Sequence, residues 1–161
     1  MENSKKIFII EDDPFYSALL HSFLKLKGYR DIHVFSKGTE ALQQLEEQPD
    51  LILIDFDLGD SAYPGKRVLQ EIRRINEQIP VIFISGQKSI HEAIQTLKFG
   101  AMDYIQKSDH TLERLDRKIN ELFHPTSVLT SMDIQKKNKR HKFFMGGIFF
   151  ILALGISISY M

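Results

Sequence analysis

The chain alternates five times between a short strand-like run and a segment with helical periodicity, and this alternation constrains its fold most. The strand-like runs are residues 7–10, 32–35, 51–54, 81–85 and 102–106. The apolar residues in these runs are largely continuous, which is typical of strands buried on both faces. Repeated strand–helix units form a parallel sheet with helices on both sides. We therefore predict a doubly wound α/β fold with five parallel strands.

The segments between the predicted strands carry apolar residues three and four positions apart, which is the spacing of one helix face. Gly28 and Gly100 follow two of these segments as helix stops, and residues 38–47 suit one helix that ends before Pro49. The stripe of the last helix consists of Leu112, Leu115, Ile119 and Leu122. We therefore assign the α/β domain to residues 1–125.

Polar residues stand at four predicted strand ends, where ligands bind in sheets of this kind. These residues are Glu11, Asp12 and Asp13 after the first strand, Asp55 and Asp57 after the third, Ser85 after the fourth and Lys107 after the fifth. Taken singly, an aspartate after a strand is commonly a helix cap or turn residue, and a lone lysine is commonly solvated. Their coincidence at one edge of the sheet favours a functional site.

The charges of this set favour phosphoryl chemistry. Two carboxylates about 5 Å apart repel by roughly 3 kcal/mol at an effective dielectric near 20, so Glu11, Asp12 and Asp55 call for a cation. Oxygen ligands in an open site suit Mg²⁺. A carboxylate so placed can attack phosphorus, while Ser85 and Lys107 offer a hydroxyl and a positive charge to the phosphoryl oxygens. The set is complete for phosphoryl transfer onto Asp55.

Four segments, IFIIEDDP, PDLILID, PVIFISG and GAMDYIQKS, together resemble the receiver domain of two-component response regulators, the CheY-like superfamily. The resemblance covers residues 5 to about 123 and implies a flavodoxin-like (βα)5 fold. It implies that Asp55 is the phosphoacceptor, that Glu11 and Asp12 bind Mg²⁺, and that the backbone carbonyl of Asp57 is a further ligand.

The resemblance also implies roles for the remaining strand-end residues and for partners. Ser85 would follow the phosphoryl group, Tyr104 would be the switching aromatic residue, and Lys107 would pair with the phosphorylated site. A histidine kinase or phosphotransfer protein would supply the phosphoryl group, and a downstream protein would bind the fourth and fifth helices with the fifth strand. Such a domain signals rather than acting as an enzyme on a substrate of its own.

Three departures from the receiver pattern are visible. Ser108 stands where the family usually has a proline, so the usual cis peptide is not expected there. The segment GDSAYPG, residues 59–65, is longer than the usual Pro-Gly turn. Asp57 lies two residues past Asp55, a position that in receivers affects the lifetime of the phosphoryl group. We hypothesise that Asp57 repels or orients the hydrolytic water.

Two other functions compete with the receiver interpretation. Asp55-Phe56-Asp57 also resembles the Asp-x-Asp nucleophile of haloacid-dehalogenase-type phosphatases, but that family has Thr or Val at the position of Gly59 and places the motif on an early strand. A binding module that keeps the receiver fold without using phosphorylation is the second alternative, and Ser108 and the altered loop favour it.

Residues 143–161 contain 19 consecutive positions without a charged side chain. As a helix they would extend about 28 Å, close to the thickness of a bilayer core. The linker 126–142 carries a basic run at 136–142, which favours a cytoplasmic location for this side of the span. We therefore expect a transmembrane helix that anchors the receiver as a single-pass protein at the inner, cytoplasmic membrane, with the receiver facing the cytoplasm.

Composition narrows the range of partners. Residues 1–125 contain 16 basic and 20 acidic side chains, and this negative balance argues against nucleic acid as a ligand of the domain. The chain has no cysteine, which excludes disulfides and thiolate metal sites.

Overall fold

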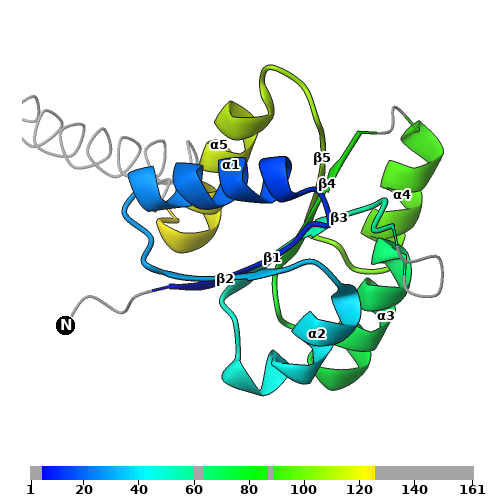
Figure 1. The fold of residues 1–161 in the computed structure, drawn as a ribbon. Coiled ribbons are helices and arrows are strands. Elements are labelled where there is room, and N and C mark those ends of the chain that lie inside the picture. The colour runs from blue at the N-terminus through cyan, green and yellow to red at the C-terminus, as the bar shows by residue number, and fades with distance from the viewer. Residues whose placement is uncertain (1–4, 60–63, 87–88, 126–161) are drawn as a thin grey trace, which may run out of the picture. The chain divides into compact units, whose positions relative to one another are not determined.

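The computed structural model describes residues 5–59, 64–86 and 89–125 and contains the predicted five-stranded parallel sheet (Figure 1). The strands are β1 (Lys6–Ile10), β2 (Asp31–Phe35), β3 (Leu51–Asp55), β4 (Val81–Ser85) and β5 (Asp103–Gln106). Their order in the sheet is β2-β1-β3-β4-β5. The winding direction reverses between β1 and β3, and this is where sheets of this class bind ligands.

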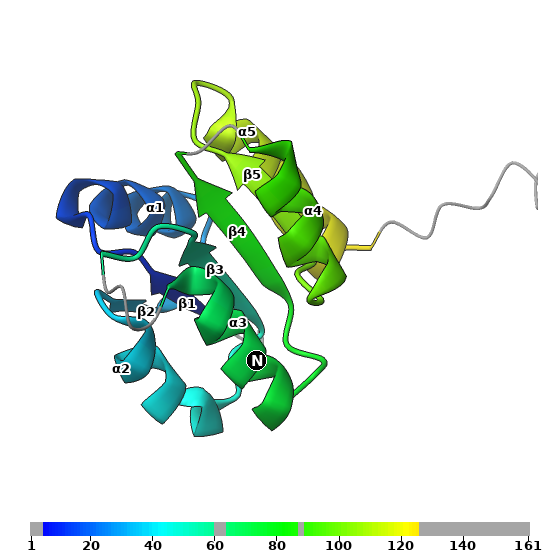
Figure 2. The same cartoon turned by 90° about the vertical axis from the view of Figure 1, so that its right-hand side faces the viewer.

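Helices connect the strands and cover both faces of the sheet (Figures 1 and 2). They are α1 (Pro14–Leu26), α2 (Gly38–Gln43), α3 (Gly65–Ile75), α4 (Ile90–Lys98) and α5 (Thr111–Phe123). α1 and the first part of α5 lie on one face, and α2 and α3 lie on the other. The doubly wound α/β prediction is therefore confirmed for the described residues.

The segment predicted as one helix, residues 38–47, differs in detail. α2 ends at Gln43, and a short 3₁₀ turn, Leu45–Glu47, follows it. Gln48 then adopts a left-handed conformation with φ of 54°. The right-handed α region is sterically disfavoured for the residue before a proline, so Pro49 disfavours continuation of a helix through Gln48.

The sheet interior explains why the strand ends are held in place. Phe8 and Ile10 of β1 pack in one cluster with Ala41 and Val68, while the intervening Ile9 faces the opposite side of the sheet and is fully buried. All five residues of β3 are buried. Because both faces of the strand are packed, its last residue, Asp55, has little freedom to move.

Residues up to Ile119 form one compact unit. None of the helices in the described ranges is both long and apolar enough to span a membrane. The predicted linker, residues 126–142, and the predicted transmembrane helix, residues 143–161, lie outside the described residues.

Candidate functional site

Backbone hydrogen bonds bring the predicted strand-end residues to one edge of the sheet. Glu11 N donates to Phe35 O at 3.0 Å, which extends the pairing of β1 with β2 by one residue. Asp55 and Ser85 are the last residues of β3 and β4. Lys107 N donates to Ser85 O at 2.7 Å, which fixes the backbone of the lysine beside β4.

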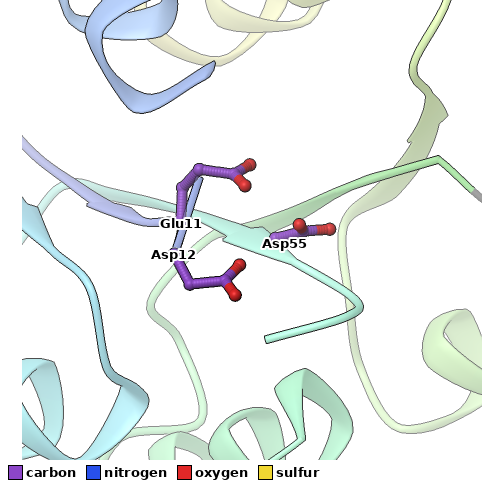
Figure 3. A group of neighbouring side chains, drawn as sticks. All are labelled: Glu11, Asp12 and Asp55. Atoms are coloured by element: carbon purple, nitrogen blue, oxygen red, sulfur yellow. The ribbon is translucent and has the colours of Figure 1, made fainter. Parts of the chain in front are cut away.

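Glu11, Asp12 and Asp55, called the acidic cluster here, converge at this edge (Figure 3). One carboxylate oxygen from each residue lies within 4.8 Å of the other two. Glu11 is 2% exposed and Asp55 is 7% exposed, whereas Asp12 is open to solvent. Carboxylates this close repel one another, and burial of two of them reduces the screening by water. The acidic cluster therefore favours a bound cation.

Lys107 neutralises part of the charge of the acidic cluster. Its Nζ lies 2.8 Å from Glu11 Oε2 and 2.9 Å from Asp55 Oδ2, and also 4.1 Å from the ring centre of Tyr16. Burial lowers the pKa of Lys107, but its hydrogen bonds to Glu11 and Asp55 outweigh this and raise the pKa above the ordinary value. The lysine is therefore a permanent positive charge between the two buried carboxylates.

Glu11 remains electrostatically strained despite this ion pair. Burial raises the pKa of Glu11 to about 7, the hydrogen bond to Lys107 opposes the rise, and the charge of Asp55 adds to it. One lysine therefore does not compensate for two buried carboxylates. A proton or a metal ion at the acidic cluster would relieve the excess negative charge.

Asp12 is held from the opposite side by the loop after β3. Gly59 N donates to Asp12 Oδ2 at 3.0 Å, so a residue of the unusual 59–65 segment contacts one predicted metal ligand. A Cβ atom added to Gly59 would lie 2.8 Å from the same oxygen. A side chain at position 59 would therefore displace the Asp12 carboxylate from its present position.

Ser85 and Tyr104 pair on the other side of Asp55. Ser85 is fully buried, and Tyr104 is 9% exposed. Burial raises the pKa of the Tyr104 hydroxyl, a hydrogen bond with the Ser85 side chain opposes this, and the charges of Glu92, Asp57 and Asp55 raise it further. The predicted hydroxyl and the predicted switching residue are therefore direct neighbours. The ring of Tyr104 also lies edge-on to Phe56, with 6.3 Å between ring centres.

Two further acidic residues near this edge bind the acidic cluster through backbone N–H groups, and Asp13 N donates to Glu11 Oε1 at 3.3 Å. Asp13 caps α1, because its Oδ1 accepts hydrogen bonds from Phe15 N at 2.8 Å and from Tyr16 N at 3.4 Å. Asp57 is exposed, and its backbone N donates to Asp55 Oδ1 at 3.3 Å. The role of the Asp57 carbonyl as a metal ligand stays a prediction.

Tyr16 and Thr111 also belong to the site, although the sequence analysis did not select them. Tyr16 contacts Lys107 from α1, and Thr111 is a buried residue at the start of α5. Thr111 directly precedes the apolar stripe of the last predicted helix, and a threonine at a helix start commonly bonds to nearby backbone groups, which is a signal that would have identified it. No local pattern would have identified Tyr16, since its contact with Lys107 depends on how α1 packs against the sheet.

The acidic cluster passes a chemical test for Mg²⁺. It consists of carboxylate oxygens alone, with one exposed residue and two buried ones, and hard divalent cations prefer such oxygen ligands. Lys107 occupies one oxygen each of Glu11 and Asp55, and Gly59 N–H occupies one oxygen of Asp12. The second oxygens of Glu11 and Asp55 accept backbone hydrogen bonds of 3.3 Å, and a carboxylate oxygen has a further lone pair that can face an ion.

Comparison with known proteins agrees with this geometry. The model of the response regulator receiver domain family matches residues 7–120. The regulatory protein LuxO of Vibrio cholerae is 29% identical over 139 residues, which are 86% of this chain and 30% of LuxO. The transcriptional regulatory protein ZraR of Escherichia coli K12 is 33% identical over 102 residues, which are 63% of this chain and 22% of ZraR.

The chain thus spans less than a third of the length of these curated relatives. Among solved structures, the receiver domain of NtrX from Brucella abortus superposes with a TM-score of 0.68 at 26% identity, covering 76% of this chain and all of that domain. Because the family model covers more than half of the sequence, the chain belongs to the response regulator receiver domain family.

Proposed function

We propose that the chain accepts a phosphoryl group on Asp55 and signals through protein–protein contacts. The observation that carries the proposal is the position of Asp55, which lies at the end of a buried strand, within the acidic cluster and beside Lys107. A histidine kinase or phosphotransfer protein is the expected donor. The receiver family consists of signalling domains, so we propose no turnover of an independent substrate.

In the proposed reaction, a carboxylate oxygen of Asp55 attacks phosphorus of a phosphohistidine. A P–O bond forms, the P–N bond breaks, and the leaving imidazole takes up a proton. Lys107, 2.9 Å from Asp55 Oδ2, stays beside the acceptor and balances the added negative charge. The Ser85 hydroxyl donates a hydrogen bond to a phosphoryl oxygen. Because Tyr104 is hydrogen-bonded to Ser85, this new bond alters the contact between the two side chains.

Glu11, Asp12 and Asp55 would hold Mg²⁺, which neutralises phosphoryl oxygens when it is bound. The backbone carbonyl of Asp57 is proposed as a further ligand. The raised pKa of Glu11 supports this assignment, because it reports an excess of negative charge that a divalent cation would offset.

Intact-mass measurement after incubation with Mg²⁺ and acetyl phosphate tests the proposal. The full chain should gain the mass of one phosphoryl group, and Asp55→Asn should abolish the gain. Asp13→Asn is a matched control, because the Asp13 side chain caps α1, and its backbone N–H, which donates to Glu11, is unchanged by the substitution. No gain in the unsubstituted chain would overturn the proposal and favour a phosphorylation-independent binding module. Steady turnover of a phosphomonoester would instead favour a phosphohydrolase.

We further propose that residues 143–161 anchor the receiver to the inner membrane, with the basic run 136–142 on the cytoplasmic side. The uncharged length of the segment and the adjacent positive charges support this. An anchor would raise the effective concentration of the receiver near a membrane-bound kinase. The chain should sediment with membranes after alkaline washing, and deletion of 143–161 should release it. Retention of the deleted chain in the membrane fraction would contradict the anchor.

A further inference from the structure

One buried threonine hydroxyl closes the turn between β5 and α5. Ser108 N donates to Thr111 Oγ1 at 2.6 Å, and Thr111 N donates to Ser108 O at 3.1 Å. The same hydroxyl lies 3.0 Å from Gln106 O and 2.8 Å from Ser108 O, and it donates its single hydrogen to one of these carbonyls. Thr111 is 2% exposed, so water has little access to replace these bonds.

This arrangement depends on an N–H group at position 108. A proline has no N–H to donate, and its ring fixes the φ angle without help from neighbours. Ser108 lacks that ring, so folding must remove its backbone freedom through other contacts. The hydrogen bond to Thr111 supplies such a contact. Within the described residues no peptide bond is cis, as the sequence analysis expected for position 108.

The turn determines where the Lys107 side chain begins. On one side, Lys107 N is bound to Ser85 O at 2.7 Å, and on the other, Ser108 is bound to Thr111. The backbone sets where the four-carbon stem starts, and therefore whether the ammonium group at its end can reach Glu11 and Asp55 together. A looser turn would let the ammonium leave its contacts with Glu11 and Asp55.

Tyr16 links the same threonine to the lysine from α1. The Tyr16 ring lies 4.1 Å from Lys107 Nζ. Burial raises the pKa of the Tyr16 hydroxyl, and a hydrogen bond with the Thr111 side chain opposes the rise. The threonine hydroxyl thus contacts both the backbone that carries Lys107 and the ring that borders its ammonium group.

We propose that Thr111 is a positioning residue that holds the Lys107 ammonium beside Glu11 and Asp55 in a turn without proline. Thr111 acts through Lys107 and the turn rather than on the phosphoryl group itself. The consequence for phosphorylation rests on the proposed phosphoacceptor function, whereas the position of Lys107 exists without any phosphate and can be measured separately.

The test replaces Thr111 with valine, which keeps the shape but removes the hydroxyl, and with serine, which keeps the hydroxyl. The first readout is the ¹⁵N NMR signal of the Lys107 ammonium in the unphosphorylated full chain, assigned by its loss in Lys107→Arg. We expect Thr111→Val to broaden or remove this signal and Thr111→Ser to restore it. Thr96→Val is a matched control, because Thr96 is a fully buried helix threonine whose hydroxyl donates to Ala93 O.

The second readout is the rate of phosphorylation by acetyl phosphate. Thr111→Val should slow it about tenfold, equivalent to about 1.4 kcal/mol in activation free energy, with Thr111→Ser close to the unsubstituted rate. In a Lys107→Met background, Thr111→Val should have no further effect. An unchanged ammonium signal in Thr111→Val would overturn the proposal. Absence of phosphorylation in the unsubstituted chain would overturn the phosphoacceptor function instead and leave the NMR result to decide the positioning role.

Discussion

The acidic side and the lysine side of the site are stabilised in different ways. On the acidic side, carboxylates that follow β1 and end β3 converge within 4.8 Å, and burial raises the pKa of Glu11 to about 7. On the lysine side, Lys107 has two carboxylate partners and an aromatic neighbour, and its backbone is bound on both flanks. The carboxylates of the acidic side repel one another, whereas the ammonium group on the lysine side has an ion-pair partner in each buried carboxylate.

This difference indicates that the two sides have different functions. Repulsion among fixed carboxylates lowers stability, but it creates affinity for a cation and for chemistry that needs one. Lys107, in contrast, keeps a positive charge at a fixed position next to Asp55. The comparison therefore predicts that substitutions on the acidic side can raise stability at the expense of metal binding, as long as they leave the packed backbone around Asp55 intact.

The largest change in stability is expected at Gly65, which packs against the backbone of Asp55. A Cβ atom at Gly65, the first residue of α3, would collide with the backbone O of Asp55 and lie 3.1 Å from Phe83 Cε1. Gly65→Ala should lower the free energy of unfolding by about 3 kcal/mol, because backbone atoms cannot move aside. Urea unfolding of the full chain measures this. Gly86→Ala is the control, since its added Cβ would meet nothing within 4 Å. Equal stability of both variants would contradict the packing argument.

The second prediction tests the repulsion between the buried carboxylates through the pH dependence of stability. The folded pKa of Glu11 is about 7, above the ordinary 4.5, so the folded state binds the Glu11 proton more tightly than the unfolded state does. The stability from this proton is fully present below about pH 4.5 and is lost as the pH rises through 7. Glutamine at position 11 does not titrate, so Glu11→Gln loses no stability as the pH rises through 7. Lys107 keeps Asp55 as a partner, 2.9 Å away.

Glu11→Gln should therefore be more stable than the unsubstituted chain by about 2 kcal/mol at pH 8, with a smaller difference at pH 5. Urea unfolding at both pH values, with a chelator present, measures the difference. Addition of Mg²⁺ should stabilise the unsubstituted chain more than the variant. A variant less stable than the unsubstituted chain at pH 8 would mean that the Glu11–Lys107 pair outweighs the repulsion.

The parts of the fold and the site that could be predicted from the sequence are those whose signal lies within one short segment. β3 and its terminal Asp55 were predictable, because a continuous apolar run ended by a carboxylate carries its own signal. The contacts of Tyr16 with Lys107, and of Gly59 N–H with Asp12, join residues 91 and 47 positions apart. Such contacts depend on how α1 and the loop after β3 pack, so no local pattern reveals them. The end of α2 at Gln43 was missed for a different reason, since residues 38–47 carry no glycine or proline after Gly38 that would mark a break within the segment.

A smaller effect is expected from the loop that holds Asp12. The Cβ atom of alanine at position 59 would lie 2.8 Å from Asp12 Oδ2. Because this oxygen is at the end of a movable side chain, Gly59→Ala should change stability by less than about 1 kcal/mol. The displaced carboxylate should weaken Mg²⁺ binding about fivefold, as measured by calorimetric titration. Gly86→Ala provides the comparison, and unchanged Mg²⁺ affinity in Gly59→Ala would show that Asp12 is not a ligand or is free to adjust.

The smallest effect concerns Asp57, which belongs to neither side of the comparison. Its exposed carboxylate lies two residues beyond Asp55, and its backbone N donates to Asp55 Oδ1. Of the two actions considered for this carboxylate, orientation of the hydrolytic water fits an exposed hydrogen-bond acceptor better than repulsion does. Asp57→Asn should therefore prolong the phosphorylated state about threefold, the effect of one weakened hydrogen bond.

Decay of the intact-mass signal after removal of acetyl phosphate measures this lifetime. Glu40→Gln, which removes one exposed negative charge on α2, controls for the change in net charge. A shortened lifetime in Asp57→Asn would mean that the carboxylate repels the water. An unchanged lifetime would remove Asp57 from the reaction and leave hydrolysis to be governed by Asp55 and its neighbours in the acidic cluster alone.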